Sequence, residues 1–253
     1  MELVGAWFTN PNIDRWNEDP NDRPHIKSMS PRAGRYPQHE DRLLHERDLV
    51  AAGCLRFAGV DEAGRGPLAG PVVAAAVILP SPWIRDGLPS PFQSLNDSKK
   101  LSGMQREDFF RRLQETPGVE YGIAMADAAT IDAINILQAT HRAMNKALQA
   151  LVPIPDHALV DGNPVPSLVV PQTALVKGDS RSYSIAAGSV LAKVTRDRWM
   201  DEADRQWPEY GFAQHKGYPT AEHLEALRRY GPCPIHRRSF APLRPTQADL
   251  FSL

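Results

Sequence analysis

Four acidic residues lie where apolar segments of the sequence end. A carboxylate at such a position can reach a substrate at the end of a buried strand. Asp61 and Glu62 end the first strand that the sequence predicts, Asp161 ends the fourth, and Asp179 follows the fifth. Charged groups at the ends of apolar strands are costly to bury unless they coordinate something. Carboxylates that converge at one sheet edge form an all-oxygen site suited to Mg²⁺ or Mn²⁺. Two such ions about 4 Å apart can support phosphodiester cleavage.

A structural role is the alternative for each of these carboxylates. Each could cap a helix or pair with a basic side chain, and Arg65, Lys177 and Arg181 lie nearby in the sequence. This is the commoner role for one Asp at a strand–turn junction, but four in corresponding places favour a metal site. Neighbouring residues on a regular strand also face opposite ways. Asp61 and Glu62 therefore share a pair of ions only if the chain bends, which the glycines that follow would permit.

The segment from Gly64 to Gly70 is rich in glycine and could be taken for a phosphate-binding loop. It is not a P-loop, because no Lys-Ser or Lys-Thr pair follows it. It is not a dinucleotide-binding fingerprint either, because a β-branched strand follows it where that motif requires a helix. Its glycines could still bring backbone N–H groups close to a sugar–phosphate.

The formal net charge is −1, from 29 basic and 30 acidic residues, so a nucleic-acid partner requires a local basic patch. Basic side chains do gather in four parts of the chain. They are Lys99 and Lys100; Lys177 and Arg181; Lys193, Arg196 and Arg198; and His215, Lys216, His236, Arg237 and Arg238, with Tyr218 among them. Such groups would suit a surface that binds metal and phosphate, but exposed Lys and Arg on helices are more often solvated faces, and this is the role we expect for each group taken alone. No partner can be assigned to His215, His223 or His236 as a general base.

The order of predicted elements indicates a mixed α/β sheet in one domain, with helical additions at the C-terminus. Strands are expected at 55–61, 71–79, 121–125, 158–160 and 173–176. Helices are expected at 41–53, after the turn at 98–100, from 130 to about 153, at 182–207 and at 221–230. Ser102 and Gln105 have the spacing of a capping box. Thr130 is expected to cap the long helix that follows it.

Composition argues against a membrane or secreted protein. The longest apolar run, at 72–79, has eight residues, whereas a spanning helix needs about 20. The start of the chain has neither the basic nor the apolar region of a secretory signal. The two cysteines, Cys54 and Cys233, exclude a disulfide framework and a four-cysteine zinc site, and we expect both to be packing residues. We therefore expect a reduced, cytoplasmic location.

Residues 1–37 differ in composition from the rest of the chain. They contain five of the 23 prolines and show no apolar period. We expect a disordered or loosely docked extension. The alternative is an over-extended start, with translation beginning at Met29.

Beyond these local patterns, the sequence resembles the ribonuclease HII family, of the bacterial type, in the same order over about residues 41–242. The matching segments are FAGVDEAGRGPLAGPV at 57–72, NDSKKL at 96–101, VDG at 160–162, KGD at 177–179, SIAA at 184–187, AKVTRD at 192–197, HKGY at 215–218, GP at 231–232 and HRRSF at 236–240. The first segment alone is highly specific. Residues 1–37 lie outside the resemblance.

The resemblance implies an RNase H-like fold, with a mixed five-stranded sheet flanked by helices and a small helical C-terminal extension. Residues 41–215 would form the catalytic domain, and 216–253 a helical part that completes the substrate groove. The implied activity is endonucleolytic cleavage of the RNA strand of RNA–DNA hybrids, and incision 5′ of single ribonucleotides embedded in duplex DNA. It would use two Mn²⁺ or Mg²⁺ ions and leave 5′-phosphate and 3′-hydroxyl ends. We expect a monomer.

The resemblance also implies a role for each site residue. Asp61, Glu62, Asp161 and Asp179 would be the catalytic residues and the metal ligands. The backbone of Gly64, Arg65 and Gly66 would contact the 2′-OH that distinguishes RNA from DNA. Tyr218 would stack on the deoxyribose beside the RNA–DNA junction. Lys99 and Lys177 are the other implied substrate contacts.

Two other classes of function stay open at this point. A different metal nuclease on the same fold, such as a DNA exonuclease or a resolvase, would share the acidic group but would have no reason for Gly64-Arg65-Gly66 together with Tyr218. A non-catalytic nucleic-acid-binding module would keep the basic groups but would have no use for four carboxylates.

Overall fold

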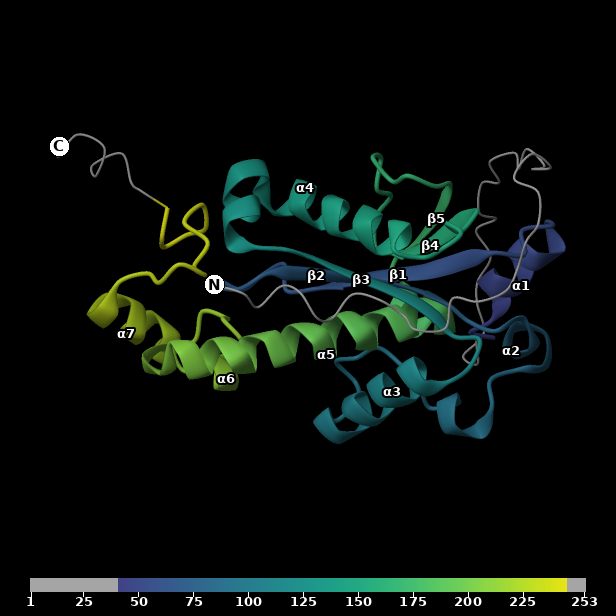
Figure 1. The fold of residues 1–253 in the computed structure, drawn as a ribbon, viewed down its shortest axis with the longest axis horizontal. Helices are drawn as coiled ribbons and strands as arrows, with labels where there is room; N and C mark the ends of the chain where they lie inside the picture. The colour runs from purple at the N-terminus through teal and green to yellow at the C-terminus, as the bar shows by residue number, and fades with distance from the viewer. Residues whose placement is uncertain (1–40, 245–253) are drawn as a thin grey trace.

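The computed structural model describes residues 41–244, and Figure 1 shows their arrangement. The extension expected at residues 1–37 lies outside the described residues. A five-stranded sheet with the order β3-β2-β1-β4-β5 forms the centre. Its strands are β1 (Phe57–Ala63), β2 (Val72–Ile78), β3 (Glu120–Ala126), β4 (His157–Asp161) and β5 (Gln172–Leu175). β1, β2 and β3 pair antiparallel, whereas β4 runs parallel to β1 and β5 parallel to β4, which confirms the mixed sheet.

Helices cover both faces of this sheet, with α4 on one side and α3 and α5 on the other (Figure 1). The α-helices are α1 (Leu44–Ala51), α2 (Ser81–Asp86), α3 (Gly103–Glu115), α4 (Ala128–Gln149), α5 (Tyr183–Gln206), α6 (Phe212–His215) and α7 (Ala221–Tyr230). Short 3₁₀ helices occur at Ser90–Phe92, Gly178–Ser180 and Pro208–Tyr210. α6 and α7 lie at one end of the molecule, so the helical C-terminal addition is confirmed.

Strand β2 shows why two cores form. All seven of its residues are buried, and its side chains alternate between the two faces of the sheet. Val73, Ala75 and Val77 belong to the core that contains α3 and α5. Ala74 and Ala76 belong to the core that contains α4. A continuous apolar strand is therefore required here, because both of its faces are covered.

The helix caps confirm one sequence expectation and correct another. Ser102 and Gln105 form the expected capping box at the start of α3. Thr130 does not cap α4: Asp127 does, and its Oδ1 accepts from the Thr130 N–H at 2.8 Å. The long helix also breaks at Asn135, where φ is 64° and the side chain accepts from the Gln138 N–H at 3.1 Å. Asn135 thus caps the second segment, which the apolar period alone does not reveal.

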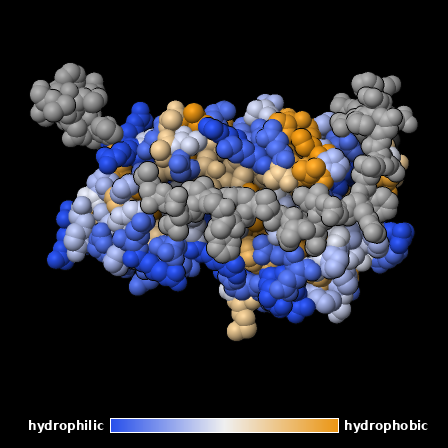
Figure 2. Space-filling view, in the orientation of Figure 1, coloured by the Kyte–Doolittle hydropathy of each residue, from blue (hydrophilic) through white to orange (hydrophobic). Residues whose placement is uncertain are grey.

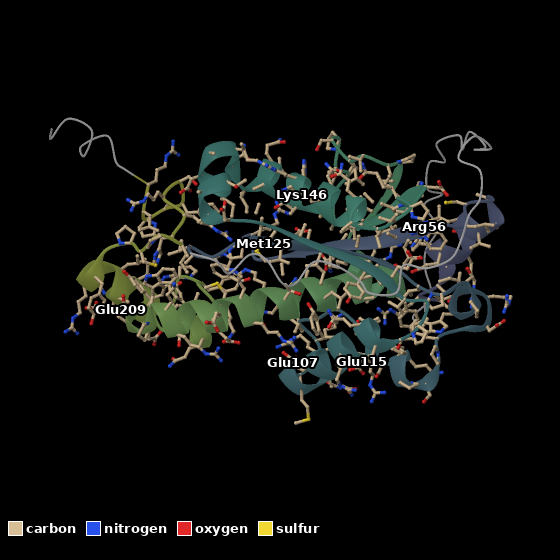
Figure 3. All side chains as sticks on the ribbon, viewed as in Figure 1. Arg56, Glu107, Glu115, Met125, Lys146 and Glu209 are labelled. Carbon is tan, nitrogen blue, oxygen red and sulfur yellow. The ribbon has the colours of Figure 1, made fainter. Side chains whose placement is uncertain are left out.

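The surface of the described part is mostly polar, as the face in Figure 2 shows. Ion pairs join separate elements across it. Glu107, labelled on α3 in Figure 3, accepts from Arg198 of α5 at 2.5 Å, and Arg56 forms two bonds with Glu120 at 2.7 and 2.8 Å. No helix within residues 41–244 has the length and apolar character needed to span a bilayer.

The approach of α5 to β1 leaves no room for a side chain at Gly59. A Cβ there would lie 2.1 Å from the Ser184 carbonyl carbon and 2.3 Å from the Ile185 nitrogen. Both atoms belong to the backbone at the start of α5, so neither moves without moving the helix. The tight contact makes Gly59 a sensitive position for the fold.

We expect Gly59→Ala to lower the free energy of unfolding by on the order of 3 kcal/mol, because α5 must shift away from the sheet. The urea midpoint measures this. Gly103→Ala is the matched control, since a Cβ at Gly103 meets nothing within 4 Å. Equal midpoints for the two variants would contradict the close packing of α5 on β1.

Candidate active site

The structure brings three of the four predicted carboxylates together. Asp61, Asp161 and Asp179 each offer an oxygen, and these three oxygens all lie within 4.8 Å of one another. β1 and β4 are parallel neighbours with Val60 beside Val160, so Asp61 of β1 and Asp161 at the end of β4 lie at the same level of the sheet. Asp179 comes from the 3₁₀ helix Gly178–Ser180, directly before α5. A position inside β1, the last residue of β4 and a 3₁₀ helix therefore supply the group, so the expectation that the first strand ends at Asp61 is corrected: β1 continues to Ala63.

Burial makes this group electrostatically unfavourable without a cation. Asp61 is 5% exposed and Asp179 is 7% exposed. Burial raises the pKa of Asp61 well above its ordinary value, and the negative charges of Glu62 and Asp161 raise it further. Burial and the charge of Asp161 raise the pKa of Asp179 to about 6. A bound cation would remove both penalties, because it would replace the lost hydration and neutralise the repulsion.

Short hydrogen bonds hold these carboxylates in place. Asp61 Oδ1 accepts from the Glu62 N–H at 2.6 Å, and Asp161 Oδ1 accepts from the Gly178 N–H at 2.6 Å. Arg42 donates to the Asp179 carbonyl at 3.0 Å. The bond from Gly178 ties the Asp161 side chain to the turn that carries Asp179, so these two residues are positioned by one contact.

Glu62 lies beside the group rather than in it. β1 continues regularly through Ala63, so the bend that would let Asp61 and Glu62 point the same way is absent here. Glu62 instead forms an ion pair with Arg65, Nη1 to Oε1, at 3.2 Å. Burial raises the pKa of Glu62 and Arg65 partly offsets this, while Asp161 still acts on it electrostatically. Glu62 is therefore paired with Arg65 in this structure, and its role as a metal ligand stays a prediction.

Two side chains that the sequence reasoning did not select join the group. Asp97 makes a side-chain hydrogen bond with Asp179, and its negative charge contributes to the raised pKa of Asp179. Ser189 of α5 makes a side-chain hydrogen bond with Asp61, and its Oγ lies 3.0 Å from Ser98 Oγ, within hydrogen-bond distance. Asp97 and Ser98 belong to the NDSKKL segment, which was the only sequence pattern that could have indicated them.

The two predicted lysines differ in placement. Lys99 lies close enough to Glu62 and Asp179 for its positive charge to lower the pKa of both. Lys177 has a left-handed backbone with φ of 56°. Among the described contacts it takes part through its backbone alone, since its carbonyl accepts from Ser180 N and Oγ at 3.1 and 2.9 Å.

The glycine loop and Tyr218 lie side by side, although about 150 residues separate them in the sequence. A Cβ at Gly66 would lie 3.7 Å from Tyr218 Cε1. Tyr218 is 46% exposed. Gly64 has a φ of 93°, a conformation that glycine adopts without strain. Gly66 of the loop and Tyr218 are thus neighbours on the exposed side of the molecule.

Several of the basic residues that gather in the sequence are buried or already paired. Arg196, His236 and Arg237 are 1%, 2% and 0% exposed. The paired ones are Lys193 with Asp197, Arg198 with Glu107, and Lys216 with Asp201. His223 and His236, for which the sequence offered no partner, bond to each other at 3.0 Å. Arg196, His236 and Arg237 are therefore neither surface cations for phosphate nor solvated, whereas Lys193, Arg198 and Lys216 are held in ion pairs.

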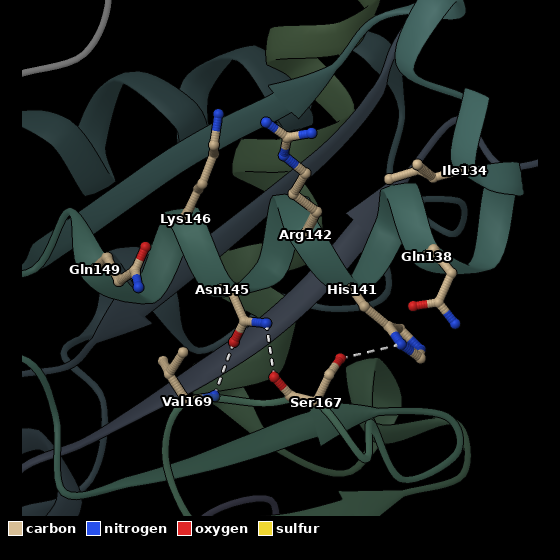
Figure 4. Close-up of a pocket in the computed structure, with 9 residues that line it drawn as sticks. All are labelled: Ile134, Gln138, His141, Arg142, Asn145, Lys146, Gln149, Ser167 and Val169. Carbon is tan, nitrogen blue, oxygen red and sulfur yellow. Dashed lines mark hydrogen bonds between the residues drawn. The ribbon is translucent and has the colours of Figure 1, made fainter. Parts of the chain in front are cut away.

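A separate hollow of about 530 Å³ lies over α4 (Figure 4). Asn145 closes one side of it by donating to the Ser167 carbonyl and accepting from the Val169 N–H, both at 2.8 Å. The lining contains no carboxylate and none of the predicted site residues. The candidate active site is therefore the sheet edge with its three carboxylates, and this hollow is a different place.

Comparison with known proteins agrees with this geometry. The family described as Ribonuclease HII matches residues 58–243. The ribonuclease HII of Geobacillus kaustophilus is 57% identical over 205 residues, which cover 81% of this chain and 75% of that protein. The ribonuclease H2 structure from Pyrococcus horikoshii OT3 has a TM-score of 0.62 at 28% identity, covering 75% of this chain and 96% of that one. Bst-RNase HIII in complex with Mn²⁺ has a TM-score of 0.60 at 20% identity, over 83% and 75%, and shows the fold alone. This chain belongs to the ribonuclease HII family and is a ribonuclease H with the RNase H-like fold.

Proposed function

We propose that this protein cleaves the RNA strand of RNA–DNA hybrids and incises duplex DNA on the 5′ side of a single embedded ribonucleotide. The observation that carries this proposal is the juxtaposition of the acidic group with the loop Gly64–Gly66 and Tyr218. An acidic group alone would suit any metal nuclease. An adjacent exposed backbone loop and an open aromatic ring supply what is needed to recognise one sugar among others.

The residues of the acidic group fit divalent metal ions. Asp61, Asp161 and Asp179 would hold one ion through carboxylate oxygens, which Mg²⁺ and Mn²⁺ prefer. Glu62 and Asp97 flank this group and are the carboxylates closest at hand for a second ion. Two bound ions would supply an activated water and stabilise the charge on the leaving oxygen, which accounts for 5′-phosphate and 3′-hydroxyl products.

The other side chains would bind and orient the substrate. Lys99 would face the phosphate backbone, since it already lies close to the carboxylates. Tyr218 would stack on the deoxyribose next to the ribonucleotide, and the loop backbone would contact the 2′-OH. Residues 216–244 pack beside the loop, and we propose that the C-terminal part completes the substrate groove there, whereas 41–215 carry the catalytic residues.

A duplex with one ribonucleotide tests this function directly. In Mn²⁺ or Mg²⁺ we expect incision 5′ of the ribonucleotide, with a product end that a DNA polymerase extends; EDTA should stop it. Asp61→Asn should lower the rate on the order of 1,000-fold while binding persists, because a metal ligand is lost and phosphate repulsion is relieved. Wild-type turnover by a folded Asp61→Asn protein, or cleavage in EDTA, would contradict the assignment.

Metal binding should also stabilise the folded protein. A ligand present at about 100 times its Kd adds about 2.7 kcal/mol, so Mn²⁺ should raise the melting temperature at pH 8. Asp161→Asn should lose this rise without lowering the melting temperature in EDTA, because like charges no longer repel. Asp156→Asn, an exposed carboxylate before β4, should keep the rise. A full Mn²⁺ response in Asp161→Asn would show that the ion binds elsewhere.

Tyr218 should contribute most to cleavage at a junction between a ribonucleotide and the deoxyribonucleotide that follows it. Losing a stacking contact costs on the order of 1–3 kcal/mol, so Tyr218→Ala should slow cleavage at a single ribonucleotide about 10- to 100-fold. A continuous hybrid offers no deoxyribose 3′ to most of its RNA positions, so its cleavage should fall less. Tyr218→Phe should be mild if the ring face makes the contact. Equal losses of kcat/KM on the two substrates would indicate a purely structural tyrosine.

A further inference from the structure

Two arginines are buried beside the glycine loop without an acidic partner. Arg196 lies on α5 and is 1% exposed, and Arg237 is fully buried. No carboxylate of residues 41–244 lies within ion-pair distance of either guanidinium. Burial lowers the pKa of Arg196 to about 10 and that of Arg237 to about 9, so both stay charged at neutral pH. A buried charge persists only where hydrogen bonds replace its hydration, so the partners of these two groups indicate what they hold.

Those partners are backbone carbonyls, and nearly all of them belong to one loop. Arg237 donates to the carbonyls of Gly64 at 2.6 Å, Arg65 at 2.9 Å and Gly70 at 2.9 Å. Arg196 donates to the carbonyls of Pro71 at 2.9 Å and Ala69 at 3.1 Å. The guanidinium fork is the one side chain with five donors in a rigid plane. The loop 64–71 is therefore wrapped around two cations through its oxygens.

The same arginines connect the loop to the segment that carries Tyr218. Arg196 Nη2 also donates to the Lys216 carbonyl at 3.1 Å. The Leu68 N–H donates to the Gly217 carbonyl at 2.8 Å, and the Arg237 N–H donates to the Leu68 carbonyl at 2.8 Å. A Cβ at Gly217 would lie 2.6 Å from the Ala69 carbonyl oxygen. The loop and the Tyr218 segment are thus fixed relative to each other by direct contact.

A histidine pair holds Tyr218 from its other side. The Cys233 N–H donates to His236 Nδ1 at 3.0 Å, so neutral His236 carries its proton on Nε2. That proton is donated to His223 Nε2 at 3.0 Å, and His223 Nδ1–H then donates to the Tyr218 carbonyl at 2.9 Å. This direction is assigned from the bonding pattern. The chain of bonds leads back to His236, the neighbour of Arg237.

The inward carbonyls determine where the loop amides point. In a trans peptide, the C=O of one residue and the N–H of the next point in opposite directions. Because the carbonyls of Gly64 and Arg65 turn inward to Arg237, the N–H groups of Arg65 and Gly66 turn outward. Arg65 and Gly66 are exposed, and neither N–H has an acceptor among the described residues. Two free donors are therefore presented next to the Tyr218 ring.

We propose that Arg196 and Arg237 are positioning residues that hold the Arg65 and Gly66 amides, together with Tyr218, in the geometry that distinguishes a ribonucleotide from a deoxyribonucleotide. The proposal rests on the proposed function. The buried guanidiniums do not touch the substrate. They act through the loop, so their loss should weaken recognition of the 2′-OH more than it weakens general binding of the duplex.

The test compares two dissociation constants in a non-cleaving protein. Asp61→Asn is used as the parent, and the probes are one duplex with a single ribonucleotide and the same duplex made of DNA only. Arg237→Lys and Arg196→Lys keep the positive charge but lose the fork. We expect each to reduce the preference for the ribonucleotide duplex about five- to tenfold, the worth of one or two hydrogen bonds, with affinity for the DNA duplex unchanged. Arg198→Lys, an exposed arginine two residues along α5, should keep the parent preference.

The ratio of the two constants separates positioning from mere stability, because a lower folded fraction weakens both constants equally. An unchanged ratio in folded Arg237→Lys and Arg196→Lys would overturn the positioning role. Unfolding of both variants would overturn it too, since the arginines would then be holding the fold itself. A parent that does not prefer the ribonucleotide duplex would instead reveal failure of the proposed function.

Discussion

The close approach of α5 to β1 is the constraint on which the candidate site depends. Gly59 lets the start of α5 touch the strand, and a Cβ at Gly188 one turn later would lie 3.3 Å from the Asp61 nitrogen. Buried Glu46 fixes this helix start by accepting from Ser182 Oγ at 2.6 Å and Ser184 N at 3.0 Å. Packing on this scale can offset the repulsion of several carboxylates, because it is spread over the whole length of the sheet.

Much of the fold could be predicted, because periodicity and capping are local properties. The apolar run at 71–79 predicted the strand that forms β2. Asp61 and Asp161, expected near the ends of two strands, are neighbours because β1 and β4 run parallel. The break at Asn135 could not be predicted in this way. It depends on the Asn135 side chain, which bonds to a nearby backbone N–H in place of the regular helical bond. Such a local bond leaves the pattern of apolar residues unchanged.

The parts of the site that could not be predicted from the sequence share one physical cause. They are formed by contacts between segments that lie far apart in the chain. Asp97 meets Asp179, and Ser98 meets Ser189, across more than 80 residues. Spacing carries no information about such pairs. Burial of a charge is equally hidden: Arg196 and Arg237 looked like surface cations, because in a sequence a basic residue is identified by its charge and not by the carbonyls that surround it.

In the proposed function, the backbone rather than a side chain would recognise the sugar of the substrate. The Arg65 guanidinium, which could have reached the substrate, is paired with Glu62 and lies beside the acidic group. A long side chain also loses rotamer freedom when it binds, whereas the loop amides are already ordered by the carbonyls on their other side. In the proposed function, the acidic group and the buried arginines are therefore complementary. Negative charge on one side of the loop would attract cations to the reacting phosphate, and positive charge beneath the loop would orient the donors that select the nucleotide.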